Sequence, residues 1–424
     1  MSRLIICGGK RLSGAYVPSG NKNAVLPMLA ACILTDQAVI LENVPLIEDV
    51  MTMLELLRQL GVSVELRDHT ATLCARGLRR SRLDPALCRK VRSSILFAGP
   101  LAARVGRATL PPPGGDIIGR RRLDTHFEGM RSLGIEICGE SQFLFRRRAL
   151  AGASILLDEA SVTATENTVM AAVLARGRTT IYNAACEPHV QDLCALLNKM
   201  GARVQGIGIN LLQIDGVEAL GGATHRIQPD YVELASFLVA AAVTGGEIAV
   251  EGVEAGPLPT IDRVFRKIGI HWNLDGGRLL LPARQKLRVT KDFASPFSKI
   301  EDGIWPAFPS DLMSVAIVAA TQASGTVLFF EKMFESRMYF VDRLIEMGAR
   351  IIQCDPHRVV VIGPTRLHGV HLASPDIRAG MAMLVAALCA RGCSTIDNAQ
   401  SIDRGYEKVE EKLRRLGADI VRED

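Results

Sequence analysis

The sequence predicts an α/β protein of two domains, in which six repeated modules bury their helices and carry their sheets outside. Three observations predict this architecture. A chain of 424 residues is too long for one ordinary core and suits two domains of roughly 200 residues. One phrase, in which a glycine leads into an alternating strand, recurs about every 70 residues, and a second, almost wholly apolar phrase recurs in step with it.

The first repeated phrase predicts a surface helix that ends at a glycine and continues into a strand. It occurs as QLGVSV, SLGIEI, KMGARV, KIGIHW, EMGARI and RLGADI, with its glycine at Gly61, Gly134, Gly201, Gly269, Gly348 and Gly417. An amphipathic segment such as YEKVEEKLRRL precedes the glycine, which can adopt the left-handed conformation that ends a helix. Each module therefore contains an outer helix followed by a strand.

The second repeated phrase predicts a helix that is buried on nearly every side. Its copies contain NAVLPMLAAC, SSILFAGPLAA, NTVMAAVLA, LASFLVAAAV, LMSVAIVAA and GMAMLVAALC, each followed by a polar or glycine-containing turn and a β-branched strand. Helices so rich in small and apolar residues have no face suited to water. The modules therefore place these helices inside and their sheets outside.

A charged residue is expected at the first turn of every buried helix. The set is Lys22, Arg92, Glu166, Glu233, Asp311 and Arg378. Acids complement the positive end of a helix, whereas Lys22, Arg92 and Arg378 oppose it unless an anion binds there. If the helices of each three-module half aim their N-termini at one shared cleft, that cleft is a phosphate or carboxylate site.

Composition and charge narrow the classes of function. Hydrophobic residues make up 48% of the chain and no run is long enough to span a membrane, so we expect a cytoplasmic protein without a signal peptide. The net charge is only +5, but residues 76–122 hold twelve Arg or Lys against two acids. The segment lacks the interleaved aromatics typical of nucleic-acid binding, so a small polyanionic ligand fits it better.

The spacing of cysteine and histidine favours neither disulfides nor a metal site. The ten cysteines form no CxxC pair, so we expect reduced thiols, and we interpret Cys389 and Cys393 as packing residues of one apolar helix. The eight histidines show no HExxH grouping. We expect no metal and no cofactor, because positive side chains and helix ends can stabilise an anionic substrate without them.

The motifs along the chain are similar to those of the enolpyruvyl transferases. SGNKNA, RSS, GGDIIG, FPSD, MFESR, DIRAG and IDRGYE follow the family's order and spacing over about residues 10–420. The resemblance implies the family's two-domain inside-out α/β barrel, with residues 22–228 as the first domain and residues 1–21 and 229–424 as the second. It also implies that the loop at residues 111–122 acts as a lid, and that the halves close on the ligand.

The same resemblance implies transfer of the enolpyruvyl group of phosphoenolpyruvate to the 3-hydroxyl of UDP-N-acetylglucosamine, with release of phosphate, as the first committed step of peptidoglycan synthesis. The residues implied to bind phosphoenolpyruvate are Lys22, Arg92, Arg121, Arg378 and Arg404. Guanidinium groups suit this task because they bind phosphate and carboxylate in a bidentate manner. Lys22 is also implied to be catalytic, and Asp311 to be the base near the acceptor hydroxyl, with a pKa raised by burial.

Asp116, in the loop PPPGGDIIGRRR, is implied to be a catalytic residue. Many family members carry at this position the cysteine that fosfomycin alkylates. A carboxylate can still relay a proton there while its loop expels water, but it is a weaker nucleophile towards an epoxide. We therefore expect the enzyme to be insensitive to fosfomycin.

The resemblance also implies a set of contacts to the uridine nucleotide and its sugar: Asn23, Arg92, Asp124, His126, Ser161, Asp311 and Phe334. The chain departs from the family pattern at Glu159, which replaces a basic residue, at Thr163, which replaces a flexible glycine, and at Tyr231, which replaces an arginine. These departures leave the acceptor open between UDP-N-acetylglucosamine and another uridine nucleotide, such as uridine monophosphate in nucleoside-antibiotic synthesis.

Other functions fit the sequence less well. Enolpyruvylshikimate phosphate synthase matches the loop and the DIRAG phrase poorly. A catalytically silent paralogue that binds a nucleotide sugar, or an RNA-binding module, would need neither the acid nor the base, yet Asp116 and Asp311 are retained. We expect small-molecule substrates and no nucleic-acid or membrane partner, and the oligomeric state stays open, with a monomer among the possibilities.

Overall fold

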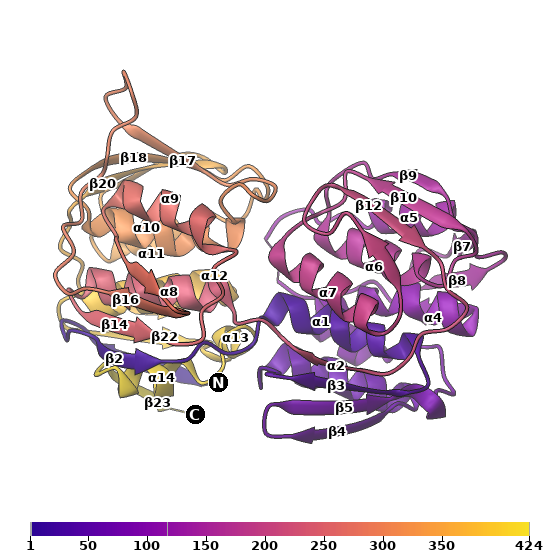
Figure 1. Cartoon of the computed structure of the whole chain (residues 1–424). Helices are drawn as coiled ribbons and strands as arrows, with labels where there is room; N and C mark the ends of the chain where they lie inside the picture. The colour runs from indigo at the N-terminus through magenta and orange to yellow at the C-terminus, as the bar shows by residue number, and fades with distance from the viewer. Residues whose placement is uncertain (1, 117, 424) are drawn as a thin grey trace. The chain divides into compact units, whose positions relative to one another are not determined.

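The computed structural model describes residues 2–116 and 118–423. The chain divides into two compact units, and each is described by itself. Unit 1 comprises Met1–Ser19, Ile117–Arg120 and Pro229–Asp424, and unit 2 comprises Gly20–Asp116 and Arg121–Gln228. Figure 1 shows that in each unit the strands lie around a central group of helices.

Unit 2 contains three modules, whose sheets have the strand orders β13-β3-β5-β4, β6-β8-β7 and β11-β12-β10-β9. Its strands are β3 (Ala38–Glu42), β4 (Ser63–Arg67), β5 (Thr70–Cys74), β6 (Arg107–Leu110), β7 (Ile135–Cys138), β8 (Phe143–Arg147), β9 (Ser154–Leu156), β10 (Arg178–Tyr182), β11 (Arg203–Gln205), β12 (Leu211–Asp215) and β13 (Ala223–Arg226). Its helices are α1 (Lys22–Ala31), α2 (Glu48–Leu60), α3 (Pro85–Lys90), α4 (Ala98–Val105), α5 (Asp124–Ser132), α6 (Val162–Ala172) and α7 (Pro188–Lys199), with 3-10 turns η1 (Cys32–Leu34), η2 (Ala75–Gly77) and η3 (Arg92–Phe97).

Unit 1 also contains three modules, with the strand orders β15-β16-β14-β2, β17-β18-β20-β19 and β21-β22-β1-β23. Its strands are β1 (Arg3–Cys7), β2 (Ser13–Tyr16), β14 (Glu247–Val250), β15 (Asn273–Asp275), β16 (Arg278–Leu281), β17 (Ser298–Glu301), β18 (Gly325–Phe330), β19 (Ile351–Asp355), β20 (Arg358–Gly363), β21 (His371–Ala373), β22 (Cys393–Asp397) and β23 (Asp419–Glu423). Its helices are α8 (Tyr231–Val243), α9 (Leu258–Ile268), α10 (Met313–Gln322), α11 (Val341–Glu346), α12 (Ile377–Cys389), α13 (Gln400–Asp403) and α14 (Val409–Arg415), with the 3-10 turn η4 (Ser310–Leu312).

The apolar phrases form the buried helices, as the sequence predicts. In unit 1 every residue of α8 from Tyr231 to Ala242 and of α12 from Ile377 to Leu388 is buried. These two helices pack against α10, and in unit 2 α6 packs against α1 and α4. The charged residue does not always occupy the first turn: Glu166 lies in the second turn of α6, and Asp311 lies in η4, before α10 begins.

The glycine that ends each outer helix adopts the expected left-handed conformation. All six have a positive φ, between 87° and 100°, and each is followed by a strand: Gly61, Gly134, Gly201, Gly269, Gly348 and Gly417. A residue with a side chain is strained in this conformation, which explains why the same residue recurs in each module. The inside-out α/β architecture predicted from the two repeated phrases is therefore confirmed.

The expectation that all cysteines are reduced thiols is wrong at one pair. Cys7 of β1 and Cys393 of β22 form a disulfide, because the antiparallel register of the two strands places them directly opposite each other. Cys393 begins a strand and is not part of the helix that ends at Cys389. Among the described residues, no helix has the length and hydropathy needed to cross a membrane.

Candidate functional site

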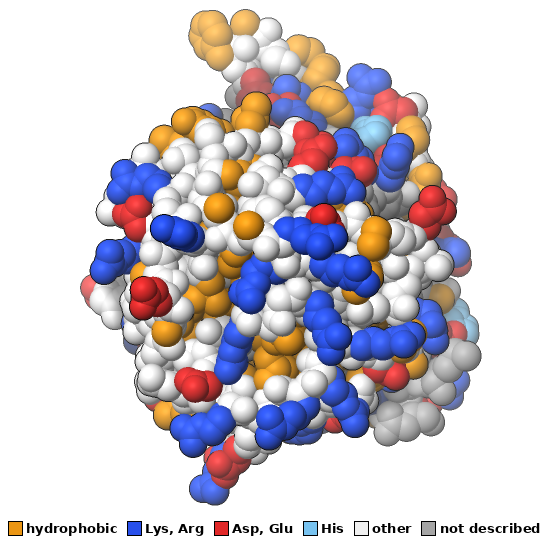
Figure 2. All heavy atoms as spheres, turned by 90° about the vertical axis from the view of Figure 1, so that its right-hand side faces the viewer, with side chains coloured by type: hydrophobic (Ala, Val, Ile, Leu, Met, Phe, Trp, Pro, Cys, Tyr) orange, Lys and Arg blue, Asp and Glu red, His pale blue; other side chains and the backbone are white. Residues whose placement is uncertain are grey.

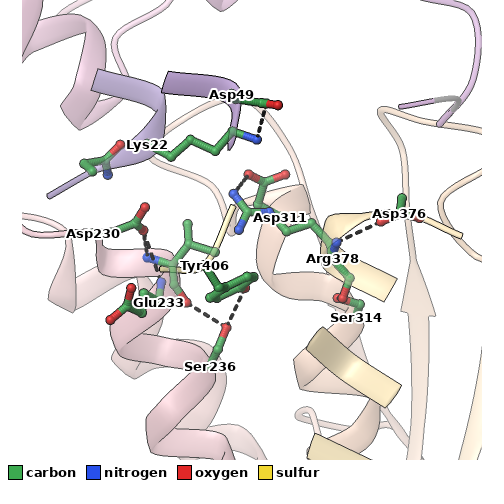
Figure 3. A network of polar contacts seen from close by, with 12 residues as sticks. Lys22, Asp49, Asp230, Glu233, Ser236, Asp311, Ser314, Asp376, Arg378 and Tyr406 are labelled. Atoms are coloured by element: carbon green, nitrogen blue, oxygen red, sulfur yellow. Dashed lines mark hydrogen bonds and ion pairs between the residues drawn. The ribbon is translucent and has the colours of Figure 1, made fainter. Parts of the chain in front are cut away.

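The predicted site residues fall in both units. In unit 2, Lys22 is the first residue of α1, which Asn21 caps by accepting the N–H of Ala24 at 3.0 Å. The Lys22 Nζ lies 2.8 Å from Oδ2 of Asp49 in α2, and at most 9% of either side chain is exposed (Figure 3). The Asp49 carboxylate offsets the cost of burying an ammonium group at the positive end of a helix. Asn23, the next residue, is partly exposed.

Sequence reasoning missed Asp49. The residue stands in the first turn of α2, where an acid is expected simply to complement the helix dipole. Nothing in the local pattern indicates that its carboxylate reaches the first residue of α1.

Arg92 and Arg121 lie close together at one end of η3. The Arg92 Nη2 donates a hydrogen bond to the backbone oxygen of Arg121 at 2.5 Å. Burial, together with the nearby guanidinium group of Arg121, lowers the pKa of Arg92 to about 10. Arg92 remains a cation at neutral pH, so two partly buried positive charges stand side by side, an arrangement that favours a bound anion.

The base of the loop at residues 111–122 packs tightly against the segment that carries Arg92. A Cβ at Gly114 would lie 1.8 Å from the backbone oxygen of Arg89, and one at Gly115 would lie 2.9 Å from the Cβ of Arg92. These two glycines permit close approach of the backbone. Asp116 follows directly and is partly exposed.

The tip of the same loop, Ile118 to Arg120, is part of unit 1. The Arg120 N–H donates to Oε1 of Glu335 at 2.8 Å, and the Ser336 N–H donates to the backbone oxygen of Ile118 at 3.2 Å. Gly119 has a φ of 132° and approaches the Glu335 carboxylate so closely that a Cβ there would lie 2.5 Å from Oε2. This tip is therefore held by a carboxylate of the MFESR phrase.

His126 is buried in α5 and is neutral. Burial lowers its pKa to about 3, and the charges of Arg92 and Arg121 act in the same direction. Asn167 Nδ2 lies 3.2 Å from His126 Nδ1, and His126 Nε2 lies 3.1 Å from Oγ1 of Thr163. Because an amide NH₂ can only donate, Nδ1 accepts and Nε2 carries the proton. Thr163, which departs from the family's glycine, therefore accepts the hydrogen bond that His126 donates.

The other predicted nucleotide residues of unit 2 lie at helix starts. Asp124 begins α5, is exposed, and accepts a hydrogen bond from Arg122 Nε at 3.1 Å, while Arg122 Nη2 reaches Oδ2 of Asp158 at 2.8 Å. Ser161 is the N-cap residue of α6, but its side chain makes no capping hydrogen bond. Glu159 is exposed. The acids and Arg122 thus form a polar edge beside the start of α6.

In unit 1, Asp311 is held by two arginines, which Figure 3 shows in part. Its Oδ1 accepts a hydrogen bond from Arg337 Nη2 at 2.9 Å, and its Oδ2 accepts one from Arg378 Nη2 at 2.7 Å. Asp311 is only partly buried, with 25% of its side chain exposed, against 6% for each arginine. Hydrogen bonds from two cations, one to each oxygen, favour the carboxylate form of an acid.

Arg378 is fixed from several sides at the start of α12. Asp376 caps the helix by accepting the N–H of Arg378 at 2.8 Å, and the Arg378 guanidinium lies 5.5 Å from the ring centroid of Tyr406. Burial alone would lower the pKa of Arg378, but Asp311 and other acidic groups raise it well above its usual value. Arg404, the C-cap residue of α13, is partly exposed two residues before Tyr406.

Arg337 is a site residue that sequence reasoning did not single out. It lies in MFESR, a phrase used for the resemblance, from which only Phe334 was assigned a role. Its guanidinium carbon lies 5.4 Å from the ring centroid of Phe334, which is partly exposed. Tyr231, the third departure from the family pattern, is buried at the start of α8 and packs 6.2 Å from the ring of Trp305.

Each unit therefore presents a group of cations with at least one carboxylate, an arrangement suited to binding anions and moving protons. Within residues 2–116 and 118–423, no three His, Cys, Asp or Glu side chains are grouped in a way that could hold a metal ion. Whether the predicted residues have the roles assigned to them stays a prediction.

Comparison with known proteins gives consistent results over the whole chain. The family profile of EPSP synthase (3-phosphoshikimate 1-carboxyvinyltransferase) matches residues 6–413. Proteins named UDP-N-acetylglucosamine 1-carboxyvinyltransferase from Bradyrhizobium diazoefficiens and Treponema pallidum are 53% and 52% identical, with 99% and 100% of this chain and 97% and 100% of theirs covered.

Solved structures share the fold. The enolpyruvyl transferase NikO from Streptomyces tendae superposes with a TM-score of 0.86 at 23% identity, covering 99% of this chain and 98% of that one. EPSP synthase from Acinetobacter baumannii superposes with a TM-score of 0.78 at 20% identity, with both chains fully covered. At these identities the likeness concerns the fold alone.

Proposed function

The chain belongs to the family of the UDP-N-acetylglucosamine 1-carboxyvinyltransferases, and from this membership we infer that it transfers the enolpyruvyl group of phosphoenolpyruvate to the 3-hydroxyl of UDP-N-acetylglucosamine. Phosphate is the second product. The reaction is the first committed step of peptidoglycan synthesis, and we place the enzyme in the cytoplasm.

The observation that carries our assignment of residues is the placement of Asp311 between Arg337 and Arg378. We assign to Asp311 the removal of the proton from the acceptor hydroxyl, whose oxygen then bonds to C2 of phosphoenolpyruvate. Arg378 pairs with Asp311 and favours its carboxylate form before the proton is transferred. The positive charge of Arg378 also suits an anionic substrate. Arg337 holds the second oxygen of Asp311 and is a positioning residue.

Proton transfer at the methylene carbon of phosphoenolpyruvate is assigned to Asp116. Addition of the acceptor oxygen at C2 requires a proton at C3, which gives a tetrahedral intermediate. Loss of phosphate with removal of a proton from C3 then restores the double bond. A carboxylic acid can donate the first proton and its carboxylate can take one back, so one side chain serves both steps.

The cations supply charge where phosphate leaves. Lys22, Arg92, Arg121, Arg378 and Arg404 are assigned to phosphoenolpyruvate. Support for two of them comes from the proximity of Arg92 and Arg121, whose positive charges lie close together beside η3. Preorganised positive charge of this kind stabilises the developing negative charge of the leaving group.

Acceptor binding is assigned to Asn23, Arg92, Asp124, His126, Ser161, Asp311 and Phe334. A second candidate acceptor is uridine monophosphate, which the exposed acid Glu159 favours, because an acid in place of a cation weakens a diphosphate contact by about 1.5 to 3 kcal/mol. The identities of 52–53% with the transferases named above favour UDP-N-acetylglucosamine as the acceptor.

Phosphate release tests the proposal directly. The purified protein is given phosphoenolpyruvate alone, with UDP-N-acetylglucosamine, or with uridine monophosphate, and phosphate is measured over time. We expect release only with UDP-N-acetylglucosamine, and a loss of kcat of about 10²- to 10⁴-fold in Asp311→Asn. Asp342→Asn, which removes an exposed acid of α11, is the matched control and should keep full activity. If neither nucleotide elicits phosphate, the protein is not this transferase, and if Asp311→Asn is as active as the control, the base lies elsewhere.

A further inference from the structure

A basic pocket in unit 2 contains arginines that the transfer reaction does not use. The cavity has a volume of about 640 Å³, and the charged residues that line it are Arg79, Arg80, Arg82, Arg107, Arg146 and one acid, Asp84. Four of the arginines come from the basic segment at residues 76–122, and none was assigned to either substrate. Figure 2 shows Lys and Arg side chains gathered on the side of the molecule where Figure 1 places β7 and β8.

The strand register explains why these side chains share one face. Arg107 of β6 lies directly opposite Arg146 of β8, and two residues further along Thr109 lies opposite Leu144. Arg82 in turn pairs with Thr109 on the other edge of β6. Since alternate residues of a strand point to the same side, the side chains of these paired residues all leave the outer face of this small sheet. Ala108 and Phe145 point the other way, into the core.

Two arginines directly opposite each other repel, and the nearest acids do not relieve the repulsion. Glu136 of β7 lies opposite Arg146 in the register, but its carboxylate forms an ion pair with Arg148 at 2.8 Å. Asp84 Oδ1 is engaged in capping α3, where it accepts the N–H of Leu87 at 2.9 Å. In the part of the chain that the structure describes, none of the five pocket arginines has an ion-pair partner. The pocket therefore keeps an excess of positive charge.

The shape and lining of the pocket define the chemistry of a ligand. Its volume falls in the range of small-molecule sites, about 300 to 1,000 Å³. Guanidinium groups bind phosphate oxygens in a bidentate manner, and five of them exceed what a single phosphate can use. The residues that line the pocket include no aromatic side chain on which a nucleic-acid base could stack. We propose that the pocket binds a compact oligophosphate, an anion with several linked phosphate groups, at a site additional to those for the two substrates.

Calorimetric titration with inorganic tripolyphosphate tests the proposal. The full chain is first saturated with UDP-N-acetylglucosamine, so that the acceptor site is occupied, and the titration is run at about 0.15 M salt, where weak surface attraction is screened. We expect one site per chain that depends on the pocket, with affinity reduced at least about tenfold in Arg107→Gln and in Arg146→Gln, since each removes a charge-assisted hydrogen bond. The double variant Arg176→Gln/Arg203→Gln is the control, because both residues are exposed in unit 2 and lie outside the pocket.

A second measurement separates binding from folding. Without ligand, Arg107→Gln and Arg146→Gln should unfold at the same temperature as the wild type or slightly higher, because each relieves the cross-strand repulsion. Tripolyphosphate should raise the unfolding temperature of the wild type and of the control variant but not of the two pocket variants. All four proteins should retain transferase activity, since no substituted residue is assigned to a substrate.

Three results would overturn the proposal. Equal affinity in the pocket variants and the control would mean that tripolyphosphate binds elsewhere or through general surface charge. Binding of tripolyphosphate to the free protein that is lost when the protein is saturated with UDP-N-acetylglucosamine would place it in the acceptor site. Tighter binding of single-stranded RNA, or of vesicles containing an anionic phospholipid, with the same dependence on Arg107 and Arg146 would show that the pocket serves a macromolecular surface.

Discussion

The stability of the protein should depend on Glu331, a buried acid that hydrogen-bonds both to Ser310, next to Asp311, and to the backbone of Met333 and Phe334. It follows β18 and is fully buried. The Ser310 hydroxyl donates to its carboxyl group at 2.9 Å, and the N–H groups of Met333 and Phe334 donate to its Oε1 at 3.3 and 3.2 Å. Burial, with the nearby Asp302, raises the pKa of Glu331 to about 9. The acid is therefore protonated at neutral pH and can donate a hydrogen bond. Among the described residues no donor reaches Oδ2 of Asp302, so this oxygen is available to accept that hydrogen bond.

The comparison of Glu331→Gln with Glu331→Ala tests this reading. Glutamine keeps an oxygen to accept from Ser310 and offers an N–H to Asp302 in place of the proton, so at about pH 5 it should match the wild type within about 1 kcal/mol. Alanine leaves the buried Ser310 hydroxyl and two partly exposed N–H groups without an acceptor and opens a cavity, which together cost about 3 to 5 kcal/mol. Because Ser310 adjoins Asp311, alanine should also lower kcat at least about tenfold.

The pH dependence of the free energy of unfolding gives the size of the expected difference between Glu331→Gln and the wild type. The folded pKa of Glu331, about 9, lies above the unfolded value of 4.5, so its contribution to stability is complete below 4.5 and is lost as the pH rises through 9. Glutamine does not titrate. Relative to the wild type, Glu331→Gln should therefore gain about 1 kcal/mol for each pH unit between about 5 and 9.

Urea unfolding followed by tryptophan fluorescence measures the difference, because both tryptophans of the chain, Trp272 and Trp305, lie in unit 1 with Glu331. Glu346→Gln, which changes an exposed acid of α11, is the matched control. The reasoning is refuted if the wild type and Glu331→Gln lose stability in parallel as the pH rises, or if glutamine is as damaging as alanine.

Three further outcomes are expected. The folded pKa of His126, about 3, lies below its unfolded value of 6.5, so the stability that this residue contributes above pH 6.5 falls as the pH drops. Between about pH 7 and 5, His126→Asn should therefore lose about 2 kcal/mol less free energy of unfolding than the wild type. Urea unfolding followed by circular dichroism measures the difference. Asp49→Asn should lower the free energy of unfolding by about 3 kcal/mol by leaving the Lys22 ammonium without its buried counter-charge, and Asp49→Asn/Lys22→Met should recover most of the loss in the same assay. Preincubation with fosfomycin should leave the wild type active and inactivate Asp116→Cys progressively, since a thiolate opens an epoxide far faster than a carboxylate does; progressive inactivation of the wild type would contradict the role assigned to the carboxylate.

The fold could be predicted largely because its information is local and repeated. A helix that ends at a glycine and continues as a strand is encoded within about fifteen residues, and six copies of the pattern reinforce one another. The apolar phrases similarly indicate burial without reference to any partner. Module two is the exception, since its apolar phrase is divided between η3 and α4 where the sequence predicts a single helix.

The contacts that complete the site could not be predicted in this way, because they join residues far apart in the chain. The Cys7–Cys393 disulfide spans 386 positions, and the Lys22–Asp49 and Arg337–Asp311 pairs join different helices or loops. An acid in the first turn of a helix has the same local pattern whether it faces solvent or a buried ammonium group. Only the packing of the modules distinguishes the two cases.

Thr163 shows how such a contact changes the interpretation of a sequence departure. Judged from the family pattern, a threonine in place of a glycine removes flexibility and brings the acceptor into question. In the structure its hydroxyl accepts the hydrogen bond that His126 Nε2 donates, so the substitution adds a polar partner for a histidine that burial keeps neutral. A neutral His126 can donate a hydrogen bond but brings no positive charge to a diphosphate. Under the proposed assignment, the positive charge near the acceptor diphosphate comes from arginines such as Arg92 and Arg121, whose mutual repulsion an anion would reduce.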